Sequence, residues 1–268
     1  MILNAYIPSK LTGIVDLIWE HEMYEPGSYT ILPSGKVEII FPINPVKQIK
    51  ATKVSLQDNP VNKFPCFLSG LHTQPINMTF ERFHTFGIQM KPVAVKALFG
   101  MPLCEIRDYY IEGSQVFDTM NIMEDKLHEI GNFTDRAKWF EDFLLSKINE
   151  SPDLHNAIHL DTKIRKFILE KRHDSDKSIL DVMGYSRTQT FRLFNEWFGL
   201  SAHSYQKLLK FISATESLHN PTFKLTDIGF ENGFYDQPHF IRTFHEFAGM
   251  TPGEYRKRMT ELPGLLFK

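Results

Sequence analysis

Residues 225–252, LTDIGFENGFYDQPHFIRTFHEFAGMTP, decide the fold of the C-terminal half. Their pattern also occurs 50 positions earlier, in residues 186–202, SRTQTFRLFNEWFGLSA. Unlike residue types coincide at this offset: Arg192 with Arg242, Phe194 with Phe244, Gly199 with Gly249, Ser201 with Thr251, and Tyr205 with Tyr255. Agreement between so many residue types at a single offset indicates an internal repeat.

Each copy carries the signals of a helix, a tight turn and a second helix. Asp236 and Ser186 stand where a side-chain oxygen can accept hydrogen bonds from the free amides of a first helical turn. Pro238 is tolerated in that first turn, and Gly249 is typical of a helix end. The apolar face of the second copy is formed by Phe240, Phe244 and Phe247. Their spacing of i, i+4 and i+7 predicts one buried helical stripe.

The opposite helix faces carry side chains that suit DNA. Amide, imidazole and guanidinium groups reach base edges and phosphates from a helix in the major groove. Basic residues that follow the turn at 249–252 can lie beside a helix N-terminus that faces a phosphate. The candidate DNA-binding residues are Arg187, Thr188, Gln189, Arg192, Tyr235, Gln237, Pro238, His239, Arg242, Arg256 and Lys257. The alternative interpretation is that these positions form ordinary solvated helix faces.

The second copy resembles the signature of the AraC/XylS family of bacterial transcription regulators. The resemblance rests on residues 233–244, GFYDQPHFIRTF, on Gly-Met-Thr-Pro at 249–252, and on Tyr-Arg at 255–256. It covers roughly the last hundred residues. It implies two helix-turn-helix units on one chain, joined by a long helix. The chain departs from the family at Leu180 and Gly229, where alanine is usual, and at Thr190, where leucine is usual.

The composition limits the classes of protein to which the chain can belong. A chain of 268 residues with 42% hydrophobic residues suffices for one large or two ordinary domains. The net charge of −2 argues against a uniformly basic surface for nucleic acid. Only Cys66 and Cys104 are present, which favours a reducing compartment. The chain shows neither a signal peptide nor an apolar run of the ~18 residues that a membrane span needs. We therefore expect a cytoplasmic protein without a membrane partner.

The N-terminal half has the pattern of short strands followed by helices. Apolar spacing between Leu11 and Ile18 predicts a short helix. Strands are predicted at 29–32, 36–41, 53–57, 66–68, 76–80 and 83–90, the first two as a hairpin around Pro33-Ser-Gly35. Helical spacing follows at 93–99, 123–130 and 136–148. This pattern suggests a sandwich or barrel with trailing helices.

This half also resembles a sensor-type domain that precedes AraC-like units in some bacterial regulators. The matching motifs are Pro8 and Leu11 before Trp19, Leu-Pro-Ser-Gly at 32–35, Leu-Ser-Gly at 68–70, and residues 86–92, FGIQMKP. The resemblance brings no known ligand with it. Aromatic residues that either line a pocket or fill a core are Trp19, Tyr24, Tyr29, Phe67, Phe83 and Phe86.

Two other functions remain open. His21, His72 and His84 in the β-rich half suggest a cupin-like metal-dependent enzyme, although their spacing is wide and ordinary histidines are favoured. The second alternative is a ligand sensor whose C-terminal half has lost strong DNA binding. Cys66 is expected to be a small buried hydrophobic residue. No catalytic residue, metal site or cofactor is assigned.

We therefore expect an α+β fold with a β-rich, cupin-like or barrel domain at 1–152 and an all-α DNA-binding domain at 153–268. Within the latter, helix-turn-helix units are expected at about 178–199 and 225–249, with a linker helix at about 202–219. The expected function is sequence-specific, effector-responsive regulation of transcription. Expected partners are double-stranded DNA, with RNA polymerase, a small-molecule effector and a second copy of the chain as further candidates.

Overall fold

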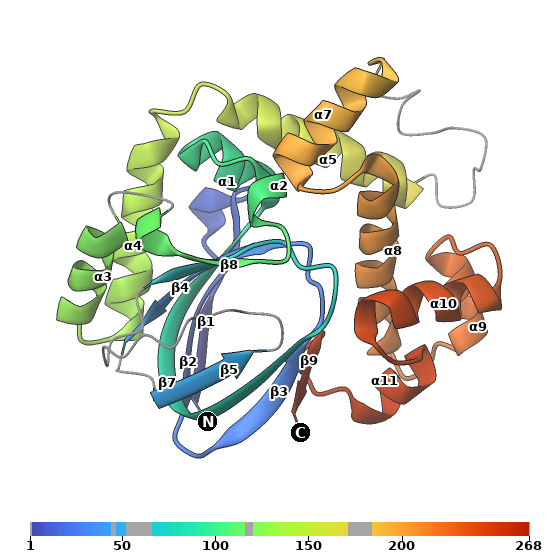
Figure 1. Cartoon of the computed structure of the whole chain (residues 1–268), viewed down its shortest axis with the longest axis horizontal. Coiled ribbons are helices and arrows are strands. Elements are labelled where there is room, and N and C mark those ends of the chain that lie inside the picture. The colour runs from blue at the N-terminus through green and yellow to red at the C-terminus, as the bar shows by residue number, and fades with distance from the viewer. Residues whose placement is uncertain (1, 44–46, 52–65, 116–119, 171–183, 268) are drawn as a thin grey trace.

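The computed structural model describes residues 2–43, 47–51, 66–115, 120–170 and 184–267. These residues form an α+β fold with an antiparallel sheet in the N-terminal half and helices in the C-terminal half (Figure 1). The predicted fold class is confirmed. The predicted strand at 53–57 and the first helix of the first helix-turn-helix unit, with Leu180, lie outside the described residues.

The sheet is built around one long strand, β7 (Ile76–Met90). Its first part pairs with β3 (Gly27–Ile31) and β5 (Lys47–Ala51), and its second part pairs with β2 (Val15–Met23) and β4 (Val37–Pro42). The remaining strands are β1 (Ile2–Tyr6), β6 (Phe67–Ser69), β8 (Tyr110–Glu112) and β9 (Leu265–Phe267). Two strands predicted at 76–80 and 83–90 are thus a single strand that serves both parts of the sheet.

The predicted hairpin around residues 33–35 is wrong. Strands β3 and β4 do not pair with each other, because β3 joins the first part of β7 and β4 joins the second. Gly35, with φ of +68°, lies in the connection between them. The prediction relied on β3 and β4 being adjacent in the sequence. Strand β7 is long enough for these two consecutive strands to pair with its opposite ends.

The predicted helix between Leu11 and Ile18 is also wrong. A 3-10 turn covers Ser9–Leu11, and residues from Val15 onward belong to β2. The register of β2 against β7 shifts between Val15 and Leu17. This irregularity lets Val15 and Ile18 be buried together in one core despite their spacing of three, which resembles a helical period.

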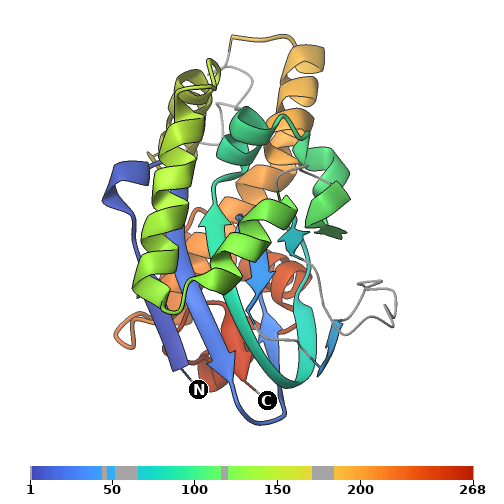
Figure 2. The ribbon, with the colours of Figure 1, turned by 90° about the vertical axis from the view of Figure 1, so that its left-hand side faces the viewer.

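Helices of the N-terminal half cover one face of the sheet. They are α1 (Pro92–Phe99), α2 (Leu103–Ile106), α3 (Met120–Glu129) and α4 (Phe133–Ile148), with a 3-10 turn at Gly113–Gln115. Alternate sheet residues such as Ile39, Phe41 and Phe86 are buried in the same cluster as Phe140 of α4. Figure 2 shows α4 in front of the sheet and the C-terminal helices behind it.

The C-terminal half contains the helices that the repeat predicts. They are α5 (Leu154–Glu170), α7 (Arg187–Phe198), α8 (Ala202–Leu218), α9 (Leu225–Glu231), α10 (Gln237–Ala248) and α11 (Pro252–Arg258). The linker helix expected at 202–219 is α8. Within the residues that the structure describes, no helix combines the length and the apolar composition that crossing a membrane requires.

Trp19 lies across a glycine of the neighbouring strand, which gives a test of the sheet. Gly87 pairs with Trp19, and a Cβ atom at Gly87 would lie 2.2 Å from Cζ2 of the indole. Gly87→Ala should therefore lower the free energy of unfolding by about 1–3 kcal/mol through overpacking, as measured by urea denaturation. Gly131→Ala, in a loop with open space, should change it by less than about 0.5 kcal/mol. Equal stabilities of the two variants would contradict this packing.

Candidate DNA-binding surface and internal cavity

The second helix-turn-helix unit has a capped helix with one buried and one exposed face. The Asp236 side chain accepts a hydrogen bond from the amide of His239, and Gly249 ends α10 with φ of +67°. The stripe of Phe240, Phe244 and Phe247 is buried, as predicted. The candidate residues on the other face are exposed: Tyr235, Gln237, Pro238 and Arg242.

His239 is half-buried and has a defined hydrogen bond. Its Nδ1 accepts from the backbone amide of Tyr235 over 3.3 Å, so in the neutral imidazole the proton is on Nε2. Burial lowers the pKa of His239 below its usual range, and the nearby Lys210 acts in the same direction. The ring is therefore suited to donate one hydrogen bond from Nε2 at neutral pH.

The first unit presents a similar helix, α7. Arg187, Thr188, Gln189 and Arg192 are exposed on it, while Phe194 is buried. Gln189 has a further role that the sequence interpretation missed. The side-chain Oε1 of Gln189 accepts from the backbone amide of Ser186 over 2.9 Å. The backbone amide of Gln189 donates to Oγ of Ser186, and the two bonds together form a capping box. The spacing Ser-x-x-Gln is a known signal of this arrangement.

The basic residues after the second unit differ from one another. Lys257 and Arg258 are exposed. Arg256 is half-buried, and its Nε and Nη2 are buried without a hydrogen-bond partner in the described part of the chain. The geometry thus favours Lys257 over Arg256 as a phosphate contact, and both assignments stay predictions.

Helix α8 joins the units through its own buried face. Phe211 packs against Phe244 and Phe247, with ring centroids 5.0 and 5.1 Å apart. Lys207 pairs with Glu246 at 2.5 Å, and Lys210 donates to the carbonyl of Gly233 over 2.6 Å. These contacts fix α10 against α8, so the spacing of the two exposed faces depends on a rigid connector.

A cavity of about 540 Å³ lies between the sheet and the C-terminal helices. Four of the candidate ligand-binding aromatics line it: Trp19, Tyr29, Phe67 and Phe83. The other two do not. Phe86 is fully buried on the opposite face of the sheet, and Tyr24 is exposed on the surface. The C-terminal half contributes further lining residues: Arg165, Ile212, Thr215, Glu216, Leu262, Pro263, Gly264 and Leu265.

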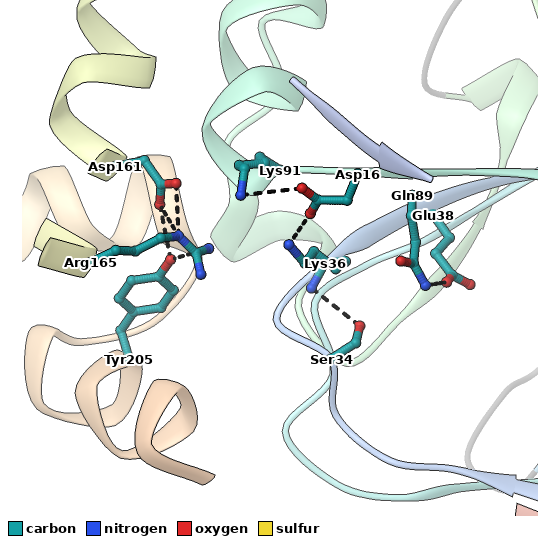
Figure 3. Close-up of polar contacts among 9 residues, drawn as sticks. All are labelled: Asp16, Ser34, Lys36, Glu38, Gln89, Lys91, Asp161, Arg165 and Tyr205. Carbon is teal, nitrogen blue, oxygen red and sulfur yellow. Dashed lines mark hydrogen bonds and ion pairs between the residues drawn. The ribbon is translucent and has the colours of Figure 1, made fainter. Parts of the chain in front are cut away.

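Three cations gather where the cavity meets α5 (Figure 3). Lys36 forms an ion pair with Asp16, and Lys91 lies 3.3 Å from the same carboxylate. Burial lowers the pKa of Lys36 to about 7, followed by the repulsion of Lys91 and Arg165. The Asp161 carboxylate opposes that shift. Lys36 and Arg165 line the cavity itself, so its wall is positively charged at this end.

Arg165 is held in place by Asp161 of α5 and Tyr205 of α8. Its Nε donates to Asp161 over 2.8 Å, and its Nη2 donates to the hydroxyl of Tyr205 over 2.8 Å. The hydroxyl of Tyr205 donates in turn to Asp161 over 3.1 Å. Tyr205 is fully buried, so this triad links α5, α8 and the cavity wall.

Three other polar groups of the cavity, Glu38, His21 and His72, are hydrogen-bonded or neutral. The Gln89 amide donates to Glu38 over 2.7 Å, and burial raises the pKa of Glu38. Burial lowers the pKa of His21 and of His72 to about 4, so both are neutral at pH 7. His84 lies 3.3 Å from Glu20 instead. Among the residues that the structure describes, no three His, Cys, Asp or Glu side chains are placed to hold a metal ion.

Sequence reasoning missed the polar wall of the cavity. Lys36, Glu38 and Ile40 alternate along β4 with the buried Val37 and Ile39, so they share the second face of the strand. Alternation of this kind was the available signal. It does not distinguish a face turned to water from one turned to an internal cavity. Cys66 is buried, as predicted, and burial raises its pKa.

Two family profiles match the chain. Residues 179–258 match the family described as Helix-turn-helix domain, and residues 5–112 match Domain of unknown function (DUF6597). The uncharacterized HTH-type transcriptional regulator YbfP of Bacillus subtilis is 32% identical over 85 residues, 32% of this chain and 29% of that protein. The probable transcription factor PqrA of Proteus vulgaris is 28% identical over 83 residues, 31% of this chain and 68% of that protein.

Solved structures show weaker overall similarity. ToxT from Vibrio cholerae O395 is 13% identical, with 91% of this chain and 97% of ToxT covered, at a TM-score of 0.46. The xylose-binding transcription activator xylR is 25% identical, with 37% of this chain and 26% of that chain covered, at a TM-score of 0.32. Scores below 0.5 are too low to assign a ligand. Residues 179–258 thus form a helix-turn-helix domain, and the resemblance of the C-terminal half to the AraC-type transcription regulators is confirmed.

Proposed function

We propose that the protein regulates transcription by reading a specific DNA sequence with α7 and α10, and that a small molecule in the internal cavity controls this binding. The observation that supports DNA reading best is the repeat itself. Each copy places a capped helix with exposed guanidinium and amide side chains at the same position. Residues near the N-terminus of such a helix contact base edges in the major groove.

The connector is of a suitable length for one chain to reach two grooves. Helix α8 has 17 residues, which at ~1.5 Å each gives roughly 25 Å. Major-groove faces on one side of B-DNA recur about every 34 Å. Helix offsets at each end make up part of the difference. A modest bend of the DNA supplies the rest, at a cost that depends on the bases between the two contacts.

The first test concerns base reading by His239. Selection from a random duplex pool, followed by sequencing, gives the preferred site of the native protein. His239→Ala should weaken binding to that site by about 1–3 kcal/mol and relax the preference at one base position, because a donor to the base edge is lost. His245→Ala, near the C-terminal end of the same helix, is the matched control. An unchanged preference in His239→Ala would remove His239 from the reading residues.

The second test concerns the rigidity of the connector. One or two base pairs inserted between the two contacted patches of the selected site should sharply reduce affinity in a shift assay. The reason is that α8 cannot lengthen, while the inserted base pairs move one contacted patch further along the duplex and rotate it around the DNA axis. Affinity should not recover at a half-turn insertion. Indifference to spacing would mean that only the second unit, around Gln237 and Arg242, engages the groove.

The residues that line the cavity indicate the chemical class of the effector. Aromatic and aliphatic side chains form most of the lining, and cations are concentrated at the end near Lys36 and Arg165. A ligand with an apolar body and an anionic group matches both features. The uncharged histidines at 21 and 72 place no additional positive charge along the apolar part.

The third test uses 1-anilinonaphthalene-8-sulfonate, an aromatic anion whose fluorescence reports binding. Lys36 is charged below a pKa of about 7 and neutral above it, so the dye should bind up to about tenfold more tightly at pH 6 than at pH 8. Lys36→Met should remove the part of this dependence that Lys36 causes, while Lys10→Met, on the surface, should keep all of it. Burial also raises the pKa of Glu38, so adding Glu38→Gln to Lys36→Met measures what Glu38 contributes. Equal binding by the native protein at both pH values would contradict the anion assignment.

A further inference from the structure

The chain does not end with the second helix-turn-helix unit. After α11, residues 260–267, here called the strap, return to the N-terminal half, where β9 pairs antiparallel with β3. The partners are Tyr29 with Phe267, Thr30 with Leu266, and Ile31 with Leu265. Figure 1 shows the red strand β9 beside the blue strand β3. A segment of the DNA-binding half is therefore part of the sensor sheet.

Hydrogen bonds tie the strap at both sides. The Gly264 amide donates to the hydroxyl of Tyr255 in α11 over 3.0 Å, and the Gly264 carbonyl accepts from the Leu32 amide over 2.8 Å. Tyr255 is fully buried and contacts Phe244 of α10, with ring centroids 5.6 Å apart. A short path of direct contacts thus runs from the recognition helix through Tyr255 and Gly264 to the sensor sheet.

Apolar burial holds the same segment. Leu266 is fully buried in the cluster that contains Leu32, and the ring of Phe267 lies 6.2 Å from that of Tyr29. Tyr29 itself lines the cavity. Strand β9 is consequently attached to the sheet by packing as well as by backbone pairing.

The strap also lines the cavity. Residues 262–265 are among the lining residues, next to β3 and the loop at 32–34. A ligand in the cavity therefore touches a segment that continues directly into α11. The strap contacts the cavity, the sheet and Tyr255 of α11, and Tyr255 in turn packs against Phe244 of α10. A change in the position of the strap therefore alters contacts with the cavity and the sheet directly, and with α10 through Tyr255.

We infer that residues 260–267 are the part of the ligand site contributed by the DNA-binding half, so that a ligand in the cavity and DNA at α10 alter each other's affinity through this strap. The inference rests on the proposed function. Thermodynamic linkage makes the effect reciprocal, because a ligand that changes the affinity for DNA must have its own affinity changed by the same factor. Ile212 and Thr215 of α8 also line the cavity, and they provide the competing route.

Gly264 allows the strap to be loosened without adding a clash. Its φ is +79°, a conformation that side chains strain, and the nearest atom to an added Cβ is Leu32 Cβ at 3.8 Å. Gly264→Ala therefore acts through the backbone alone. Gly100→Ala is the matched control, since Gly100 has φ of +74° with nothing within 4 Å and lies at the end of α1. The two variants carry similar local strain in different places.

The experiment measures the affinity for 1-anilinonaphthalene-8-sulfonate with and without a saturating 40-base-pair duplex that contains the selected site. In the native protein and in Gly100→Ala, the duplex should change the dye's dissociation constant at least threefold. In Gly264→Ala that ratio should fall to about one, while the variant still binds both dye and DNA. Hydrogen exchange of the β3 amides should rise in Gly264→Ala only, which shows that the strap has opened.

Two results would overturn the inference. One is a ratio of one in the native protein although it binds both dye and DNA. The other is an unchanged ratio in Gly264→Ala once β3 exchange has risen, which would assign the coupling to α8. If β3 exchange does not rise in Gly264→Ala, a variant that ends at Pro263 removes strand β9 instead. An unchanged ratio in that variant would likewise assign the coupling to α8. Failure of the native protein to bind DNA would instead contradict the proposed function.

Discussion

A hydrophobic cluster shared by both halves of the chain is the constraint on which the rest of the structure depends. It contains Leu32 and Val93 from the N-terminal half together with Phe194, Phe244 and other residues of both repeat units. At one contact, a Cβ atom at Gly199 would lie only 2.8 Å from the carbonyl oxygen of Leu103, so α7 meets α2 without a gap. Burial on this scale means that neither unit can move without exposing apolar surface that the N-terminal half now covers.

The repeat supplies two attachment points at equivalent positions. Tyr205 and Tyr255 are both fully buried, and a buried hydroxyl without a partner is costly, so each must find one. The first meets Asp161 and Arg165 at the cavity wall, whereas the second meets Gly264 of the strap and His219. The same side chain, repeated 50 positions later, thus connects each unit to the cavity by a different route.

Local signals in the sequence predict the C-terminal half well and the sheet poorly. Caps and glycines such as Asp236 and Gly249 act within a few residues, so their helices are found where they are expected. Strand pairing depends on distant partners, which is why the hairpin at 33–35 and the helix before Ile18 are wrong. Among the aromatics, Phe86 and Phe83 both lie on β7, and only the register of that strand decides which one faces the cavity.

The polar wall of the cavity is the feature that folding alone explains least. Burying Lys36 near Lys91 and Arg165 lowers its pKa by disfavouring the charged form, so the native state carries a cost at neutral pH that an apolar side chain would avoid. A cavity of about 540 Å³ lined mainly by apolar side chains adds a second cost, because this apolar surface is not buried against other protein atoms. Two destabilising features in the same place are expected where binding, not stability, determines the residues. An anionic ligand would offset both by filling the volume and by favouring charged Lys36, so its binding free energy would also stabilise the sheet to which the strap is attached.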